Sequence, residues 1–209
     1  QSIQVPEAVV NLWERVCRRA IADGDVQIIP GNGEAVRAHG HVLEEASPVL
    51  QAMLQSTWRE GQTGAGGQLA PRVIRVEESE STVRTLVELL YLGSLPAEDA
   101  VLADGGENAG HDLLAVFKLC HRWQLCSLGD VLEAHLAQKV DTHNIEAMLE
   151  IAVLQGAIVL KRSCLDKATD CPELERKLRS GELAPAVAAE LRKIFGIDEP
   201  SAKKRRTII

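Results

Sequence analysis

The spacing of apolar residues at the start of the chain predicts an amphipathic helix over residues 6 to 22. Pro6 and Glu7 suit its first turn, and one apolar stripe recurs at spacings of four, three and four residues. The stripe consists of Val5, Val9, Leu12 and Val16. This helix precedes every predicted strand, so the stripe either packs within the chain or associates with a second molecule.

Short apolar runs bounded by turn residues predict a small sheet. Residues 26 to 29 and 34 to 38 form a hairpin around Pro30-Gly31-Asn32-Gly33, because Pro presets one backbone dihedral and Gly permits positive φ. A third strand is predicted at Val73, Ile74 and Val76. The Gly-x-Gly of the turn lacks the third glycine and the following helix of a dinucleotide site, so we interpret it only as a turn.

Helical spacing returns after the hairpin. Ser47 suits an N-cap and Pro48 a first helical position, and the apolar face of the helix that follows is expected to be buried. That face consists of Val49, Leu50, Met53 and Leu54. Ser79 or Ser81 caps a further helix, which ends at Gly93. The other helices are predicted at residues 111 to 123, 128 to 140, 144 to 155, 157 to 169, 174 to 178 and 183 to 195.

Two segments have the composition of solvated loops, residues 61 to 71 and residues 96 to 110. The helix pair between residues 144 and 169 has an apolar set that includes Ile158 and Leu160. The pattern as a whole is therefore a short sheet surrounded by helices and followed by further helices.

Composition limits the classes of partner. Hydrophobic residues make up 45% of the 209 residues and aromatic residues only 3%, so the core is aliphatic. The net charge of -7 argues against binding to the phosphate backbone of nucleic acids. No apolar run approaches the roughly 18 residues that a membrane span needs. The chain has five cysteines, an odd number that lies mostly within apolar helical patterns, which indicates buried thiols of a reducing compartment. They are Cys17, Cys120, Cys126, Cys164 and Cys171. We therefore expect a soluble intracellular protein, with neither nucleic acid nor membrane as a partner.

The residues that could carry chemistry do not form a catalytic pattern. His39 and His41 lack a second Cys/His pair at zinc spacing, so a packed and hydrogen-bonded His39 is the favoured interpretation. Cys120 and His121 are neighbours on a predicted helix and point about 100° apart, which excludes a nucleophile pair. We expect no enzymatic activity, no metal and no cofactor.

The order of several short pieces resembles the BTB/POZ domain. They are Asp25-Val26, Ala38-His39, Val42-Leu43, Ser47-Pro48, Met53, Trp58-x-Glu60 and the run from Leu89 to Gly93. The resemblance implies an α+β fold, a small sheet wrapped by helices with an all-helical C-terminal extension. Further pieces resemble, more narrowly, the speckle-type POZ protein group. These are Val5-Pro6-Glu7, Leu12-Trp13-Glu14, Ala168-Thr169-Asp170 and a basic end.

The resemblance implies a division of the chain into four parts. Residues 1–24 are a leading dimerisation helix, 25–140 the BTB/POZ domain, 141–197 an extension like a 3-box or BACK domain, and 198–209 a disordered basic tail. Members of the speckle-type group carry a substrate-reading MATH domain before the BTB/POZ region, and residues 1 to 209 contain no such domain.

The function that the resemblance implies is that of a dimeric adaptor, which brings protein substrates to a cullin-3 ubiquitin ligase. It assigns the cullin contact to Leu54, Trp58 and Glu60. It assigns the dimer interface to Val5, Val9, Leu12, Val16 and Val42. The alternative for Trp58 is that its indole folds back onto its own domain.

A compact basic tetrad lies close to the C-terminus of this acidic chain. It consists of Lys203, Lys204, Arg205 and Arg206. It is interpreted as a nuclear import signal or, alternatively, as an incidental charged end. The protein is expected in the nucleus, the cytoplasm or both. The alternative function is a nuclear BTB/POZ scaffold or transcriptional co-regulator that dimerises without binding cullin.

Overall fold

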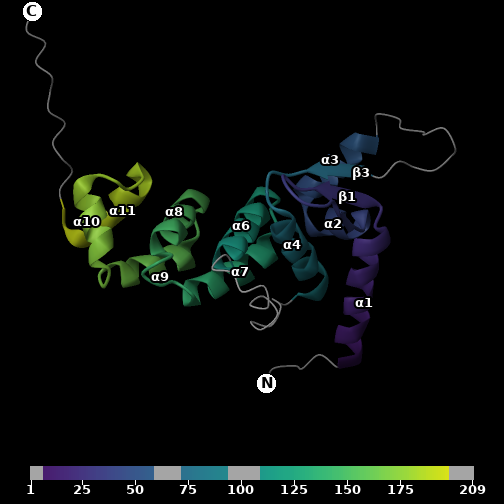
Figure 1. Ribbon diagram of the computed structural model, residues 1–209, viewed down its shortest axis with the longest axis horizontal. Helices are drawn as coiled ribbons and strands as arrows, with labels where there is room; N and C mark the ends of the chain where they lie inside the picture. Colours follow the sequence, from purple (N-terminus) through teal and green to yellow (C-terminus); the bar gives the residue numbers. More distant parts are fainter. Residues whose placement is uncertain (1–6, 59–71, 94–108, 198–209) are drawn as a thin grey trace, which may run out of the picture. The chain divides into compact units, whose positions relative to one another are not determined.

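The computed structural model describes residues 7–58, 72–93 and 109–197 (Figure 1). The chain divides into two compact units, Gln1–Leu132 and Glu133–Ile209, and the division lies inside helix α7 (Cys126–Gln138). The described residues of the first unit combine a small sheet with helices, and those of the second form helices only. The predicted α+β arrangement with a helical extension is confirmed, whereas the predicted boundary before Asp141 stays a prediction.

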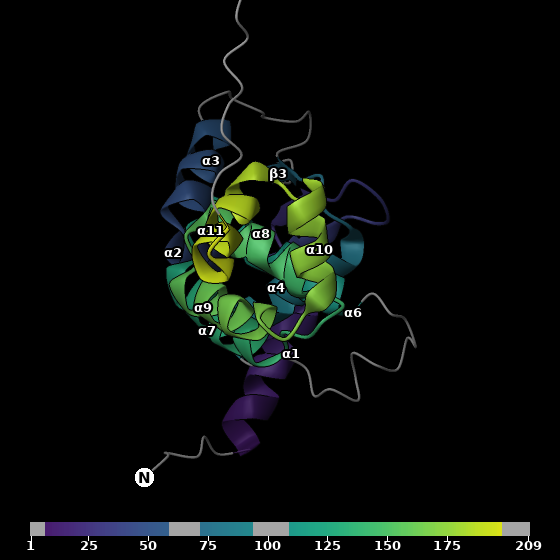
Figure 2. The same ribbon diagram turned by 90° about the vertical axis from the view of Figure 1, so that its left-hand side faces the viewer.

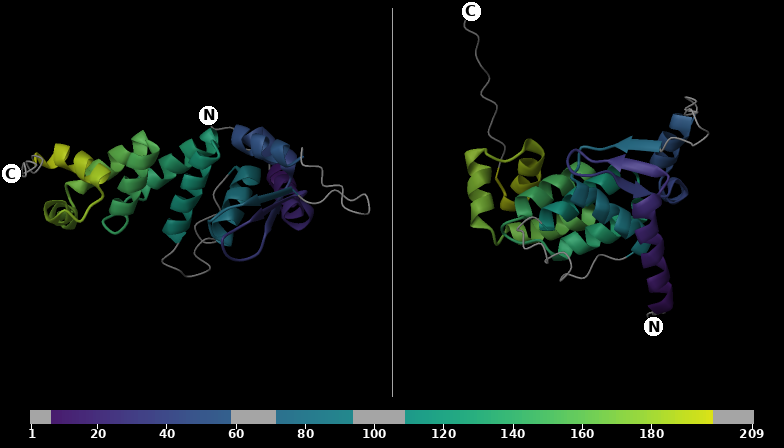
Figure 3. Two further views of the ribbon diagram at one scale, coloured as in Figure 1. Left: turned by 90° about the horizontal axis from the view of Figure 1, so that it is seen from above. Right: turned by 45° about the vertical axis from the view of Figure 1, so that its right-hand side comes forward.

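The sheet of the first unit has three strands in the order β2-β1-β3. The central strand β1 (Val26–Ile29) pairs antiparallel with β2 (Val36–Ala38) and parallel with β3 (Arg72–Arg75), as Figure 3 shows. Val26 and Ile28 are fully buried, as the two-residue period of a strand requires for one inward face. The predicted hairpin and third strand are therefore present.

Helices cover this sheet and one another. α1 contacts α4 and β2, α4 contacts β2 and α6, α2 contacts α3, and α3 contacts β3. Their bounds are α1 Glu7–Asp23, α2 Gly40–Ala46, α3 Pro48–Trp58, α4 Glu80–Leu92 and α6 Ala109–Arg122. Phe117 on α6 is completely buried, which places α6 in the aliphatic core that the composition predicts.

The predicted helix ends are formed by the expected side chains. The hydroxyl of Ser47 accepts from the backbone N–H of Leu50 at 3.0 Å and donates to the carbonyl of Trp123, which anchors α3 to the segment after α6. Ser79 caps α4 by accepting from the N–H of Thr82 at 3.2 Å. Gly93 ends α4 with φ of 65°, where a glycine is unstrained.

The second unit contains a cluster of four helices after α7, which Figure 2 shows from one end. They are α8 Ile145–Gln155, α9 Ile158–Ala168, α10 Pro172–Ser180 and α11 Pro185–Phe195. α8 and α10 each contact both α9 and α11. Leu149, Leu160 and Leu191 have no exposed surface, so this unit has an aliphatic core of its own.

Two apolar residues that the helical patterns suggested as core residues lie on the surface. Met53 is 37% exposed although Leu50 and Leu54 beside it on α3 are fully buried. Ile158, the first residue of α9, is 75% exposed although Ala157 before it and Leu160 after it are buried. The spacing identifies the apolar side of a helix, but the neighbouring elements determine how much of that side is covered.

Candidate protein-interaction surfaces

Helix α1 is docked along only part of its length. Cys17 and Ala20 in its second half are 4% and 0% exposed, on a helix that packs against α4 and β2. Val9 and Leu12 in its first half are 39% and 48% exposed, and Val16 is half-buried. Figures 1 and 3 show this first half extending away from the strands of the same unit. The predicted stripe is thus available to a partner, except that Val5 lies outside the described residues.

The exposed apolar face of α1 is wider than the stripe found in the sequence. Val10 is 44% exposed and Trp13 is 47% exposed. Trp13 follows Val9 by four residues and Val10 by three, so both lie beside the predicted stripe, which followed a single line of side chains along the helix. The second helical spacing, from Val10 to Trp13, is the sequence signal that could have revealed the wider face. We call Val9, Val10, Leu12 and Trp13 the α1 face.

Val42 lies in the short helix α2 and is half-buried. Its helix begins at Gly40, whose N–H donates to the carboxylate of Asp25 at 2.7 Å. The same carboxylate binds the Arg72 guanidinium, which also binds Glu44 on α2. Although burial acts to raise the pKa of Asp25, the Gly40 N–H and Arg72 hold that pKa below its ordinary value. This network fixes α2 against β1 and β3.

The residues predicted to contact cullin-3 occupy different environments. Leu54 is completely buried, so its side chain belongs to the core of the first unit and offers no surface to a partner. Met53, the residue before it, is 37% exposed. Trp58 is the last residue of α3, and its side chain and the whole of Glu60 lie outside the described residues. The basic tetrad Lys203, Lys204, Arg205 and Arg206 also lies outside them.

His39 is packed and hydrogen-bonded, as predicted. Its backbone N–H donates to the Tyr91 hydroxyl at 2.9 Å, and that hydroxyl lies 3.0 Å from the His39 Nδ1. The ring of His41 lies 5.6 Å away, centroid to centroid. Among the described residues, no group of three His, Cys, Asp or Glu side chains could hold a metal ion.

The cysteine thiols are all free, and they differ in accessibility. Cys120 is buried in α6, whereas the neighbouring His121 is exposed and its ring meets that of Phe117 at 4.8 Å. Burial raises the pKa of Cys120 and of Cys164 to about 12. Four of the five thiols are buried as predicted, and Cys126, which is exposed at the start of α7, corrects that prediction for one position.

This difference predicts selective alkylation. Iodoacetamide at pH 8 is expected to modify Cys126 at least about a hundredfold faster than Cys120 and Cys164, because only the thiolate reacts and burial suppresses its formation. Peptide mass mapping over time measures the three rates. In guanidinium chloride the rates should converge, and equal rates in the folded protein would contradict the described burial.

No family model matches the chain. It is 26% identical over 171 residues to BTB and MATH domain-containing protein 40 of Caenorhabditis elegans, which covers 79% of this chain and 38% of that protein. It is 27% identical over 133 residues to BTB/POZ and TAZ domain-containing protein 2 of Arabidopsis thaliana, which covers 64% of this chain and 33% of that protein. Both relatives are named for a BTB domain.

The chain resembles BTB/POZ domain proteins. Among solved structures, the BTB domain of human gigaxonin matches with a TM-score of 0.41 and 15% identity, over 63% of this chain and 93% of that one. The chain spans between one third and two fifths of the length of its two curated BTB relatives. The two curated relatives support the predicted BTB/POZ domain, while the narrower speckle-type grouping stays a prediction. None of the described helices is both long and apolar enough to cross a membrane.

Proposed function

We propose that this protein is a dimeric substrate adaptor of a cullin-3 ubiquitin ligase, of the speckle-type POZ group. The observation that carries the proposal is the α1 face, four apolar side chains that are 39–48% exposed on a helix whose other half is docked. The similarity to BTB proteins supports an interaction module rather than an enzyme. Its contribution to ubiquitination is proximity, because two copies raise the effective concentration of substrate near the ligase.

The α1 face can contribute part of the free energy of a symmetric dimer. Full burial of such a side chain contributes about 1.5–3 kcal/mol, and about half of that remains to be gained at these exposures. Two copies of the four side chains then contribute roughly 6–12 kcal/mol, against an association cost of about 4–15 kcal/mol. The α1 face is therefore only marginally sufficient, and we assign Val5, Val16 and Val42 to the same interface.

The proposed contact with cullin-3 is the end of α3. Met53 offers an exposed apolar side chain there, and Trp58 and Glu60 follow as an apolar-x-Glu triplet in the sequence. The apolar member of such a triplet is expected to enter a hydrophobic spot on the cullin, with the acid ordering the contact. Leu54, also assigned to this contact by the sequence, is buried in the core of the first unit.

Trp58→Ala is expected to weaken binding to the purified N-terminal region of cullin-3 by at least about 2 kcal/mol, a roughly 30-fold increase in Kd. The reason is that large aromatic anchors carry most of the binding energy of protein interfaces. Calorimetry measures the Kd, with Gln55→Ala as the matched control, since Gln55 is an exposed polar residue of the same helix. Unchanged affinity of Trp58→Ala would reject the triplet, and a wild-type chain that does not bind cullin-3 would favour the nuclear scaffold.

The basic tetrad is proposed to direct the adaptor to the nucleus. Replacing Lys203, Lys204, Arg205 and Arg206 by alanine is expected to move a fluorescently tagged chain largely to the cytoplasm, because clustered basic side chains are what an import receptor recognises. The nuclear fraction is measured by imaging. A second variant that replaces four exposed basic residues, Arg162, Arg176, Arg179 and Lys193, controls for loss of the same charge. A nuclear fraction unchanged by the tetrad variant would make the tetrad incidental.

A further inference from the structure

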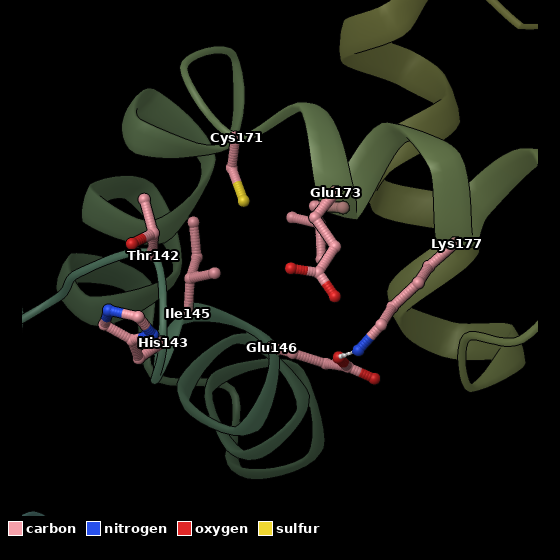
Figure 4. A pocket seen from close by; sticks show the side chains of 8 residues that line it. Thr142, His143, Ile145, Glu146, Cys171, Glu173 and Lys177 are labelled. Atoms are coloured by element: carbon pink, nitrogen blue, oxygen red, sulfur yellow. Dashed lines mark hydrogen bonds and ion pairs between the residues drawn. The ribbon is translucent and has the colours of Figure 1, made fainter.

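The cavity beside Cys171, between the starts of α8 and α10, has a volume of about 240 Å³. Figure 4 shows its charged side, where the Lys177 ammonium donates to Glu146 at 2.6 Å. Glu173, which also lines the cavity, lies 3.8 Å from the guanidinium of Arg176. The charges of this cavity are therefore satisfied within the chain, unlike those on one face of the sheet in the first unit.

The sheet of the first unit, drawn as arrows in Figure 3, has one face that the described helices cover and one that they leave largely open. On the covered face lie residues that are at most 2% exposed, Val26, Ile28, Val36, Ala38 and Ile74. The side chains between them point to the opposite side, because successive residues of a strand alternate. On that side Gln27 and Ile29 are half-buried, and Arg37, Val73 and Arg75 are exposed. We call these five residues the outer sheet face.

The register of the strands places the two arginines on opposite sides of the outer sheet face. Gln27 of the central strand β1 is paired with Arg37 of β2 and with Val73 of β3, and Ile29 is paired with Arg75 of β3. Neighbouring strands are about 4.8 Å apart, so β2 and β3 are separated by roughly 10 Å. Ile29 therefore lies between the two arginines, with Val73 beside it as a second apolar contact.

Arg37 and Arg75 have no hydrogen-bond or ion-pair partner within the part of the chain that the structure describes. Arg84 and Arg122 of the same unit, by contrast, bind glutamates at 2.7 and 2.5 Å. Glu77 is exposed two residues after Arg75, yet it is not paired with that arginine. The chain as a whole has a net charge of -7. The outer sheet face is thus a cationic surface with an apolar centre on an acidic protein.

We propose that the outer sheet face binds an acidic amphipathic helix of a partner polypeptide. An α-helix with its side chains is about 10–12 Å wide, which matches the separation of roughly 10 Å between β2 and β3. The apolar stripe of the helix packs on Ile29 and Val73, and carboxylates on the two flanks of the stripe meet Arg37 and Arg75. Arginine binds a carboxylate through two parallel hydrogen bonds, so acidic flanks are favoured over neutral ones. The helix adds the second covering layer that an apolar sheet surface favours.

The size of the outer sheet face sets the expected affinity. Strands β1 and β3 have four residues each and are about 13 Å long, so the contact is smaller than the roughly 1,000 Å² of a stable interface. We therefore expect a transient contact with a Kd on the order of 100 µM. Neither the α1 face nor the proposed cullin-3 contact belongs to this surface.

The first test measures binding of an acidic helical peptide to the full chain by calorimetry. The peptide is acetyl-Ala-Glu-Leu-Glu-Ala-Leu-Leu-Ala-Glu-Leu-Glu-amide, whose leucines form one stripe at helical spacing with glutamates on both sides of it. The same peptide with glutamine in place of glutamate is expected to bind at least about fivefold more weakly. The double variant Arg37→Gln/Arg75→Gln is expected to weaken binding of the glutamate peptide by a similar factor. Its matched control is Arg162→Gln/Arg176→Gln, which removes two arginines of the second unit with side chains 84% and 63% exposed and should bind as the wild type does.

The second test exchanges the charges, which separates a site on the sheet from the net charge of the chain. Arg37→Glu/Arg75→Glu is expected to bind the peptide with lysine in place of glutamate at least about fivefold more tightly than the wild type does. Arg162→Glu/Arg176→Glu adds the same charge to the second unit and should show no such gain. No binding of the glutamate peptide at about 2 mM, equal binding of the glutamate and glutamine peptides, or equal effects of the sheet variants and their controls would overturn the proposal. The comparison of the two peptides uses the wild-type chain, so it decides even where a variant is unstable.

Discussion

Replacing Gly24 by alanine is expected to destabilise the first unit by about 3 kcal/mol. A Cβ at this position would lie 2.5 Å from the carbonyl oxygen of Ala20 and 2.5 Å from that of Ala38. One oxygen belongs to the last part of α1 and the other to the end of β2, so neither can rotate away as a flexible side chain would. The alanine therefore separates α1 from the sheet or displaces the backbone of both.

Tryptophan fluorescence makes this measurement specific for the first unit. The three tryptophans, Trp13, Trp58 and Trp123, all precede the division after Leu132. A two-unit chain need not unfold in one step, so a probe confined to one unit avoids a mixed transition. Urea unfolding followed by this fluorescence yields the free energy of unfolding of the first unit in wild type and variant.

Gly129→Ala is the matched control for Gly24→Ala. Gly129 lies inside helix α7 of the same unit, and a Cβ there meets no atom within 4 Å. Alanine is favoured over glycine within helices, so this variant is expected to be more stable by about 0.5–1 kcal/mol. Equal urea midpoints for Gly24→Ala and Gly129→Ala would contradict the close packing of α1 against β2 at Gly24.

Local patterns in the sequence predict the elements of this fold because their physical causes are local. The hydroxyl of Ser47 and the missing N–H of Pro48 act within one helical turn, and the left-handed backbone at Gly93 needs only a residue without a Cβ. The hairpin follows from its turn residues in the same way. These are the parts that the structure reproduces.

Long-range packing determines the features that the sequence did not reveal. The ion pairs of Arg72 with Asp25 and Glu44 join residues far apart in the chain, and no spacing rule connects them. The exposure of Met53 and the burial of Leu54 depend on which elements cover α3, although both lie on its apolar side. The cavity beside Cys171 likewise exists only once α8 and α10 are adjacent.

Leu12→Asp is expected to convert the proposed dimer into a monomer. In a symmetric interface the substitution occurs twice, which removes two leucines from the contact and places two carboxylates in a poorly hydrated environment. The combined loss is at least about 4 kcal/mol, or about a thousandfold in Kd. Leu12 is 48% exposed within one chain, so the same substitution leaves the fold of the protomer intact.

Sedimentation equilibrium distinguishes a particle of twice 22.7 kDa from one of 22.7 kDa. Asn11→Asp is the matched control: it adds the same charge to the preceding residue, which is exposed and points about 100° away from Leu12 around the helix. We expect this control to remain dimeric. Unfolding followed by Trp fluorescence should start from a folded protomer in both variants, and the Asn11→Asp dimer should be the more stable of the two at high protein concentration, because association stabilises the native state. A wild-type chain that is monomeric at micromolar concentration, or a Leu12→Asp variant that remains dimeric, would show that the exposed face of α1 serves another partner.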